Sequence, residues 1–187
     1  MASRTGRISE ESPVGLRAWL NMCMVRCLLA LGSNIGEREA HLRAGLAGLA
    51  EYGVRRIRCA SLYSTEPKGI LAQPWFLNTA VEVETTLEPE ELMQVCQAVE
   101  QSRNRQRSVP NGPRTLDIDI ILYGDRVVDS DDLTIPHPRY RARRFVLEPL
   151  AEIASDAIDP VNGRTIGSLL EEVSDESGVN RVGAPPI

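Results

Sequence analysis

The spacing of apolar residues switches between the strand period and the helix period along most of the chain, and the order of these segments is the strongest constraint on the fold. Short apolar or alternating runs indicate strands, whereas apolar residues at i, i+4 and i+7 indicate a helix. The pattern predicts strand 25–31, helix 37–52, strand 54–63, strand 76–84, helix 90–103 and strand 116–123. This β-α-β-β-α-β order predicts an α+β, ferredoxin-like sheet with helices on one face and the other face open to a ligand.

The segments outside this pattern are less regular. Residues 1–24 are rich in Arg, Glu and Ser, and we expect them to form a loosely attached N-terminal extension. The main domain is expected at 25–170, where loops and two short helices follow the last strand, and 171–187 is expected to be a C-terminal tail. A chain of 187 residues has room for one such domain.

Composition argues against several classes of protein. A net charge of −5 disfavours binding of nucleic acid, which requires a basic surface. The four cysteines form no C-x-x-C pair and are accompanied by two histidines, so a structural zinc site is not expected. Reduced thiols of this kind are typical of the cytoplasm. No apolar run reaches the eighteen residues of a membrane span, and neither a P-loop nor a Rossmann glycine motif occurs.

Two aspartates alternate with apolar residues on the strand predicted at 116–123. Side chains on a strand point to alternate faces, so Leu116, Ile118 and Ile120 can enter the core while Asp117 and Asp119 share the opposite face. Two carboxylates about 7 Å apart repel each other, and Mg²⁺ carrying a polyphosphate would relieve that repulsion. The alternative is a solvated acidic face. The flanking apolar residues and the preceding Gly-Pro-Arg favour a metal site.

An arginine cluster precedes this strand, in a loop that contains proline and glycine. Guanidinium groups bind phosphate oxygens in pairs and neutralise charge on a leaving group. The alternative is a set of cations that stabilise the end of the preceding helix, and Arg103 fits that explanation. Arg105 and Arg114 lie beside the aspartate pair in sequence and fit phosphate binding better.

Three further features are candidates for ligand contact. Phe76 and Asn78 share the polar face of their strand, where a ring and an amide can hold a flat heterocycle, although a lone Phe on a strand is more often part of the core. His137 follows a proline close to Arg141, Arg143 and Arg144, and it is either a phosphate contact or a plain turn histidine. The turn Gly32-Ser33-Asn34 could present backbone amides to a ligand. His41, on a helix exterior, is expected to be inert.

Taken together, these motifs resemble one enzyme family, 6-hydroxymethyl-7,8-dihydropterin pyrophosphokinase. The resemblance runs from about Val25 to Leu170, and its most specific part is the stretch Gly-Pro-Arg-Thr-Leu-Asp-Ile-Asp at 112–119. The supporting motifs are Leu31-Gly32-Ser33-Asn34, Tyr63-Ser64-Thr65, Phe76-Leu77-Asn78, Pro89-Glu90-Glu91-Leu92 and Pro136-His137.

The resemblance implies transfer of the β,γ-diphosphate of ATP to the hydroxymethyl group of 6-hydroxymethyl-7,8-dihydropterin, which gives AMP and a pterin diphosphate for folate synthesis. It implies the following residues: Arg105, Arg114, Asp117 and Asp119 in catalysis, with the two aspartates holding two Mg²⁺ ions; Glu100, Arg107, His137 and Arg143 on the nucleotide; and Thr65, Phe76, Asn78 and Phe145 on the pterin. From the thiols, the net charge and the lack of a spanning run we expect a cytoplasmic protein without a nucleic-acid or membrane partner, and we expect a monomer without an obligate protein partner.

Two other classes of protein share parts of this pattern. Polymerase palms and nucleotide cyclases combine a ferredoxin-like sheet with paired aspartates, but their aspartates come from separated elements and they would not need Phe76 and Asn78. An RNA-binding module on the same sheet would need exposed aromatic residues on two central strands and a basic surface.

Overall fold

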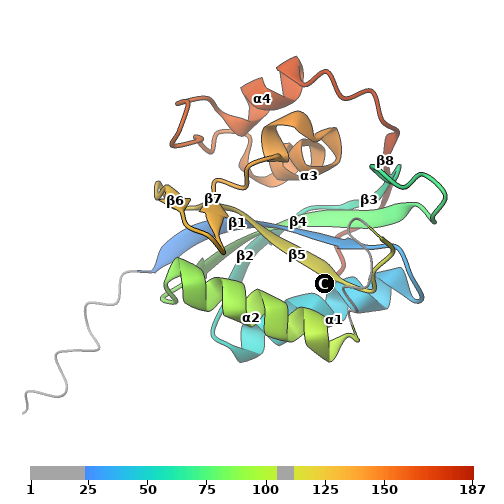
Figure 1. Ribbon diagram of the computed structural model, residues 1–187, viewed down its shortest axis with the longest axis horizontal. Coiled ribbons are helices and arrows are strands. Elements are labelled where there is room, and N and C mark those ends of the chain that lie inside the picture. The colour runs from blue at the N-terminus through green and yellow to red at the C-terminus, as the bar shows by residue number, and fades with distance from the viewer. Residues whose placement is uncertain (1–23, 105–111) are drawn as a thin grey trace, which may run out of the picture.

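The structure, a computed structural model, describes residues 24–104 and 112–187 and arranges them around an antiparallel sheet with helices on both sides (Figure 1). The neighbouring strands follow the order β5-β1-β4-β3-β8, and β2 also pairs with β4. The strands of this sheet are β1 (Val25–Ser33), β2 (Arg55–Cys59), β3 (Leu62–Thr65), β4 (Phe76–Thr85), β5 (Asp117–Tyr123) and β8 (Val179–Gly183). A two-stranded ribbon consists of β6 (Val128–Asp129) and β7 (Thr134–Ile135).

Two helices, α1 (Arg38–Glu51) and α2 (Pro89–Ser102), cover one face of the sheet, as the sequence predicted. Proline begins α2, and the Glu91 side chain accepts a hydrogen bond from the backbone N–H of Glu88 (2.8 Å), which satisfies one donor at the helix start. The core on this side joins apolar residues of both helices to alternate residues of the strands. It includes Leu42, Leu46, Leu49, Leu92, Cys96, Val99, Leu29, Leu31, Leu77, Val81, Leu116, Ile118 and Ile120.

The other face of the sheet, which we call the second face, is partly covered by α3 (Arg144–Ala154), and α4 (Ile166–Glu172) packs against α3 (Figure 1). Buried Val146, Leu147 and Leu150 of α3 pack in a second apolar cluster with Leu28 and Ala80 of the sheet. A helix with such an apolar stripe must bury it, and the uncovered strand surface supplies the partner. The ferredoxin-like core is confirmed, and α3 leaves only part of the second face open.

The strand predicted at 54–63 is divided into β2 and β3. At the break, the backbone N–H of Ala60 donates to Ala80 (2.8 Å) and its carbonyl accepts from the Thr79 hydroxyl (2.8 Å). The two parts then pair with different stretches of β4, which lengthens the contact between this edge and the central strand.

The expectation of a C-terminal tail at 171–187 is wrong for residues 179–183. These residues form β8, which pairs antiparallel with β3, so that Thr65 lies opposite Val179 and Tyr63 opposite Arg181. Without β8, the backbone N–H and C=O groups on the outer side of β3 would form an unpaired sheet edge. The N-terminal extension predicted at 1–24 falls almost entirely outside the described residues. No helix within 24–104 and 112–187 has the length and apolar character needed to cross a membrane.

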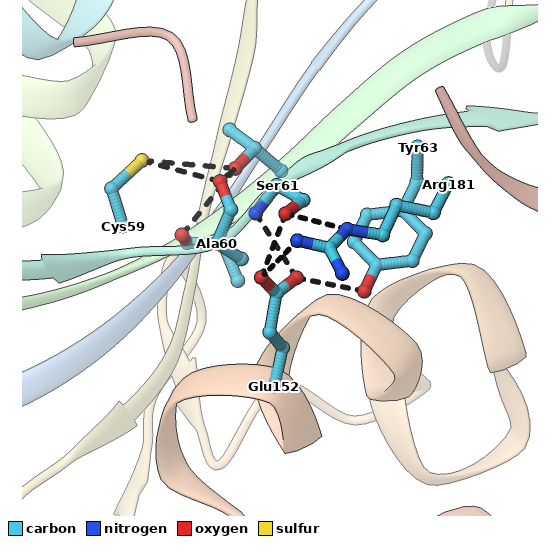
Figure 2. A network of polar contacts seen from close by, with 8 residues as sticks. Cys59, Ala60, Ser61, Tyr63, Glu152 and Arg181 are labelled. Carbon is cyan, nitrogen blue, oxygen red and sulfur yellow. Dashed lines mark hydrogen bonds and ion pairs between the residues drawn. The ribbon is translucent and has the colours of Figure 1, made fainter. Parts of the chain in front are cut away.

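Glu152 of α3 joins this helix to the sheet (Figure 2). Its carboxylate accepts hydrogen bonds from the backbone N–H (3.0 Å) and hydroxyl (2.7 Å) of Ser61 and from the Tyr63 hydroxyl (2.8 Å). Arg181 of β8 donates to the Ser61 hydroxyl (2.8 Å) and lies 3.5 Å from the same carboxylate. The network fixes α3 over β3, and this placement determines where the residues at the start of α3 lie.

Candidate active site

A cavity lies on the open part of the second face, beside the start of α3. Its walls come from β1, the end of β3, the start of β4, the loop before β5, β5 itself and the start of α3. They include Gly32, Thr65, Phe76, Asn78, Arg114, Asp117, Asp119, Arg143 and Phe145. The structure therefore brings together residues that the sequence assigned separately to a pterin, to a metal and to phosphates.

Gly32 of β1 is the point where the two halves of the cavity meet. In the sheet register it lies opposite Asn78 on β4 and opposite Asp117 on β5. A Cβ atom at this position would be 2.4 Å from Asn78 Oδ1 and 3.7 Å from Phe76 Cδ1. A glycine is therefore required here, since the Asn78 side chain lies across the backbone of β1.

The half of the cavity on β3 and β4 suits a flat heterocycle with a hydrogen-bonding edge. Asn78 is buried and donates from Nδ2 to the Thr65 hydroxyl (2.6 Å), which fixes the orientation of its amide. Phe76 and Phe145 both line the cavity. Each ring is in contact with a guanidinium group, Arg114 above Phe76 (5.1 Å to the ring centre) and Arg143 above Phe145 (5.6 Å). The aromatic and amide groups of the sequence prediction thus lie in one place.

The half of the cavity on β5 is acidic. Asp117 and Asp119 point to the second face while Ile118 enters the core between the sheet and α2. Arg114 Nε lies 3.1 Å from Asp117 Oδ2. Desolvation within the cavity and the charge of Asp117 raise the pKa of Asp119 to about 7. A cation bound to both carboxylates would offset the desolvation and the repulsion that disfavour two ionised side chains here.

The acid pair fits Mg²⁺ by its donor chemistry. Carboxylate oxygens are hard ligands, and Mg²⁺ is commonly held by one or two carboxylates while phosphates and water complete its shell. Within the described ranges, no third Asp, Glu, His or Cys joins Asp117 and Asp119 in a group that could hold a metal ion. A site of this composition leaves most of the Mg²⁺ coordination shell to other oxygen ligands, such as water or phosphate.

His137 lies beside the acid pair, and its Nε2 is 3.9 Å from Asp119 Oδ2. The backbone N–H of Arg139 donates to His137 Nδ1 (3.1 Å), so the proton of the neutral ring is on Nε2, which faces Asp119. Burial, followed by the charges of Arg143 and Arg139, lowers the pKa of His137 to about 4. His137 is therefore a neutral ring beside Asp119, although it does not itself line the cavity. Its contact with a phosphate stays a prediction.

Other candidates lie elsewhere. Glu100 does not line the cavity: it is a buried residue of α2, and its Oε1 accepts from the backbone N–H of Ile118 (2.7 Å), which holds the start of β5. Its role toward a nucleotide stays a prediction. Arg105 and Arg107 lie outside the described residues. Of the three arginines that the sequence analysis grouped with His137, Arg141 pairs with buried Asp159 and Arg144 with Glu148 (3.0 Å), so only Arg143 of the three reaches the cavity.

Sequence reasoning missed two residues that line the cavity. Glu66 and Lys68, from the loop after β3, line the cavity, and their only signal was a turn-rich segment with two prolines. Asn34 is buried and joins two loops: its Oδ1 accepts from the backbone N–H of Arg114 (2.8 Å), and its Nδ2 donates to the carbonyl of Pro74 (3.1 Å). The Asn34 N–H, expected to meet a ligand, instead donates to the carbonyl of Arg114 (3.1 Å).

Comparison with known proteins identifies the family. A family model described as 7,8-dihydro-6-hydroxymethylpterin-pyrophosphokinase (HPPK) matches residues 28–155, which is more than half of the chain. The chain belongs to this family. Membership confirms the resemblance seen in the sequence, and with it the expectation of an ATP-dependent pyrophosphokinase of folate biosynthesis.

Curated relatives agree with this assignment. A 2-amino-4-hydroxy-6-hydroxymethyldihydropteridine pyrophosphokinase of Methylorubrum extorquens is 41% identical over 160 residues, which cover 85% of this chain and 99% of that protein. The protein of the same name from Synechocystis sp. is 45% identical over 147 residues, which cover 78% of this chain and 75% of that protein. A longer relative, the folic acid synthesis protein fol1 of Pneumocystis carinii, is 36% identical over 147 residues, and the match spans 79% of this chain and 20% of that protein.

A solved structure of Plasmodium falciparum HPPK-DHPS, wild type with STZ-DHP, has a TM-score of 0.65 at 15% sequence identity. The match covers 80% of this chain and 43% of that chain. At this identity the likeness shows the fold alone, and it agrees with the ferredoxin-like core described above.

Proposed function

We propose that this chain transfers the β,γ-diphosphate of ATP to the hydroxymethyl oxygen of 6-hydroxymethyl-7,8-dihydropterin and releases AMP. The proposal depends on one observation: two different half-sites lie side by side in one cavity. One half contains an amide and aromatic rings, the other contains two carboxylates, and Gly32 lies between Asn78 of the first and Asp117 of the second. A pterin bound in the first half would hold its side arm toward the polyphosphate bound in the second.

The pterin would bind at Thr65, Phe76, Asn78 and Phe145. Because Thr65 accepts from the Asn78 amide nitrogen, the amide oxygen is turned toward β1, where it can accept from an N–H on the pterin edge. The rings of Phe76 and Phe145 would stack on the heterocycle in place of Arg114 and Arg143, which now lie over them. Release of these two guanidinium groups would make them available for phosphate.

The triphosphate would bind over β5. Asp117 and Asp119 would hold two Mg²⁺ ions, which when bound neutralise and orient the phosphates. Arg114 and Arg143 would bind phosphate oxygens through paired N–H groups, and neutral His137 would donate one hydrogen bond from Nε2. From the sequence alone, Arg105 and Arg107 are proposed to act on the transferring group and the nucleotide, and Glu100 on the nucleotide.

In the proposed reaction the hydroxymethyl oxygen forms a bond to the β-phosphorus, and the bond between that phosphorus and the α,β-bridging oxygen breaks. The electron pair stays on AMP, and the hydroxyl proton is released. Catalysis then depends on positioning the two substrates and on cations that stabilise the leaving AMP.

We propose a cytoplasmic monomer that needs neither nucleic acid nor membrane. Support for a reducing compartment comes from Cys27, Cys59 and Cys96, which are free thiols; burial raises the pKa of Cys27 to about 12 and so makes it unreactive.

Isothermal titration with hydroxymethyl-dihydropterin, with and without Mg²⁺ and a non-hydrolysable ATP analogue, tests the two half-sites. We expect both ligands to bind, with pterin affinity lost in Asn78→Ala and kept in Asn180→Ala, a change of the same size at an exposed position on β8. If the unchanged protein bound neither ligand, or if both variants behaved alike, the proposed function would be wrong.

A further inference from the structure

The segment between α4 and β8 lies beside the cavity without lining it. Asp175, in the middle of this segment, is acidic, and its side chain is only 4% exposed. A buried carboxylate needs partners, and those of Asp175 come from the start of α3, from the loop after β3 and from its own segment. The first two partners belong to or adjoin walls of the cavity.

The first partner is the start of α3. Asp175 Oδ2 accepts from the backbone N–H of Arg144 (3.1 Å), the first residue of the helix. The residue before the helix is Arg143, whose cationic side chain cannot cap these N–H groups. Asp175 therefore supplies the negative cap from a distant part of the sequence. Because Arg144 lies between Arg143 and Phe145, the same hydrogen bond fixes the backbone of both cavity residues.

The second partner is the loop after β3. Lys68 lines the cavity, and its Nζ donates to Asp175 Oδ1 (2.5 Å). The third partner is the segment's own Ser177, whose N–H (3.0 Å) and hydroxyl (2.6 Å) both donate to Oδ1. Burial alone would raise the pKa of Asp175, but these hydrogen bonds hold it well below its usual range, so the carboxylate is ionised.

Gly178 strengthens the contact with the same loop. Its carbonyl accepts from the backbone N–H of Glu66 (3.0 Å), and Glu66 also lines the cavity. A Cβ atom on Gly178 would lie 3.0 Å from the Trp75 ring, so the ring packs directly on this glycine. Trp75 immediately precedes Phe76. Contacts of residues 175–178 thus reach both ends of the loop 66–75.

We propose that Asp175 is a positioning residue for the pterin half of the active site. It links the start of α3, which carries Arg143 and Phe145, to the loop that carries Glu66 and Lys68, and so sets the width of the cavity between them. The inference rests on the proposed function, because it assigns the pterin to this half. Asp175 touches no substrate itself.

The test compares Asp175→Ala and Asp175→Asn with Glu176→Gln, which removes a neighbouring exposed carboxylate. For each variant, titration calorimetry gives the dissociation constants of hydroxymethyl-dihydropterin and of a non-hydrolysable ATP analogue with Mg²⁺. We expect Asp175→Ala to weaken pterin binding at least about tenfold and to weaken binding of the ATP analogue clearly less, because Arg143 is the proposed triphosphate contact whose backbone this hydrogen bond fixes. Asparagine keeps an acceptor for the Arg144 N–H, so Asp175→Asn should show an intermediate loss, and Glu176→Gln none.

Two results would overturn the proposal: unchanged pterin affinity in either Asp175 variant, or equal losses for both ligands, which would indicate a purely structural role. If Asp175→Ala does not fold, the pterin dissociation constants of Asp175→Asn and Glu176→Gln are compared instead, and equal values would overturn the proposal. A wild-type chain that does not bind the pterin would refute the proposed function, and the positioning role with it. A wild-type chain that binds it while Asp175→Asn binds equally well refutes the positioning role alone.

Discussion

Gly32→Ala should separate the two half-sites, because this glycine lies between them. The new methyl group would be placed 2.4 Å from Asn78 Oδ1, whereas ordinary contacts of a Cβ begin near 3.4 Å. The Asn78 amide would therefore have to move by about 1 Å, a shift that its buried hydrogen bond to Thr65 (2.6 Å) opposes. Asp117, on the other side of Gly32, belongs to a different strand and is not displaced by this contact.

The size of the effect follows from the hydrogen bonds that Asn78 makes. Loss of one buried hydrogen bond partner costs about 1–3 kcal/mol, which corresponds to a rise of about 5- to 150-fold in the pterin dissociation constant. The stability of the fold should fall by a similar amount if the Thr65 contact breaks. Affinity for the ATP analogue should change by less than about twofold, since no phosphate ligand moves.

Titration calorimetry with each ligand measures both effects, and urea unfolding measures the stability. Gly183→Ala is the matched control, because Gly183 is also a strand glycine and its added methyl group would meet Leu62 at an ordinary 3.4 Å. Pterin affinity that is unchanged in Gly32→Ala, or lost equally in Gly183→Ala, would refute the placement of the pterin against Asn78.

Three further predictions concern other parts of the site and its support. Asp117→Ala and Asp119→Ala should each abolish turnover at saturating Mg²⁺ while thermal unfolding shows an intact fold, since removal of like-charge repulsion does not destabilise the strand; near-normal turnover in either would contradict the metal assignment. Phe145→Ala should raise the pterin dissociation constant about tenfold and leave the ATP analogue unchanged in calorimetry, and equal losses would indicate a packing role. Desolvation raises the pKa of Glu152, but hydrogen bonds from Ser61 and Tyr63 outweigh it and lower this pKa in the folded protein. The ionised Glu152 carboxylate therefore stabilises the fold at a pH above its unfolded pKa, and this contribution is lost as the pH falls through its folded pKa. Urea unfolding should therefore show Glu152→Gln less stable by about 1 kcal/mol at neutral pH, with the difference shrinking as the pH is lowered into the acid range; a difference that stays constant in acid would contradict this.

Local periodicity was enough to predict the core and the faces of the strands. The alternation around Ile118 placed Asp117 and Asp119 on the second face, and the structure confirms this because side-chain direction on a strand depends on position alone. The spacing of Leu42, Leu46 and Leu49 likewise predicted the buried side of α1. These inferences need no knowledge of distant contacts.

Features that depend on distant contacts were not predictable. Lys68 and Asp175 are 107 residues apart in sequence, and nothing near either residue indicates the other. The segment Val179–Gly183 exposes most of its side chains, so it lacks the alternation of a half-buried strand, and its register with β3 is not visible in its sequence. The resemblance assigned Glu100 to the nucleotide, which stays a prediction, while nothing in the sequence indicated its contact with the backbone N–H of Ile118, a donor that every residue except proline carries.

The measurement that tests diphosphate transfer most directly is analysis of the nucleotide product. Purified protein, ATP, Mg²⁺ and hydroxymethyl-dihydropterin are incubated, and the products are separated by chromatography. Attack at the β-phosphorus expels AMP, attack at the γ-phosphorus expels ADP, and attack at the α-phosphorus expels pyrophosphate. We predict AMP and pterin diphosphate in equal amounts, both absent when the pterin is omitted. ADP or pyrophosphate as the product on the nucleotide side would contradict diphosphate transfer.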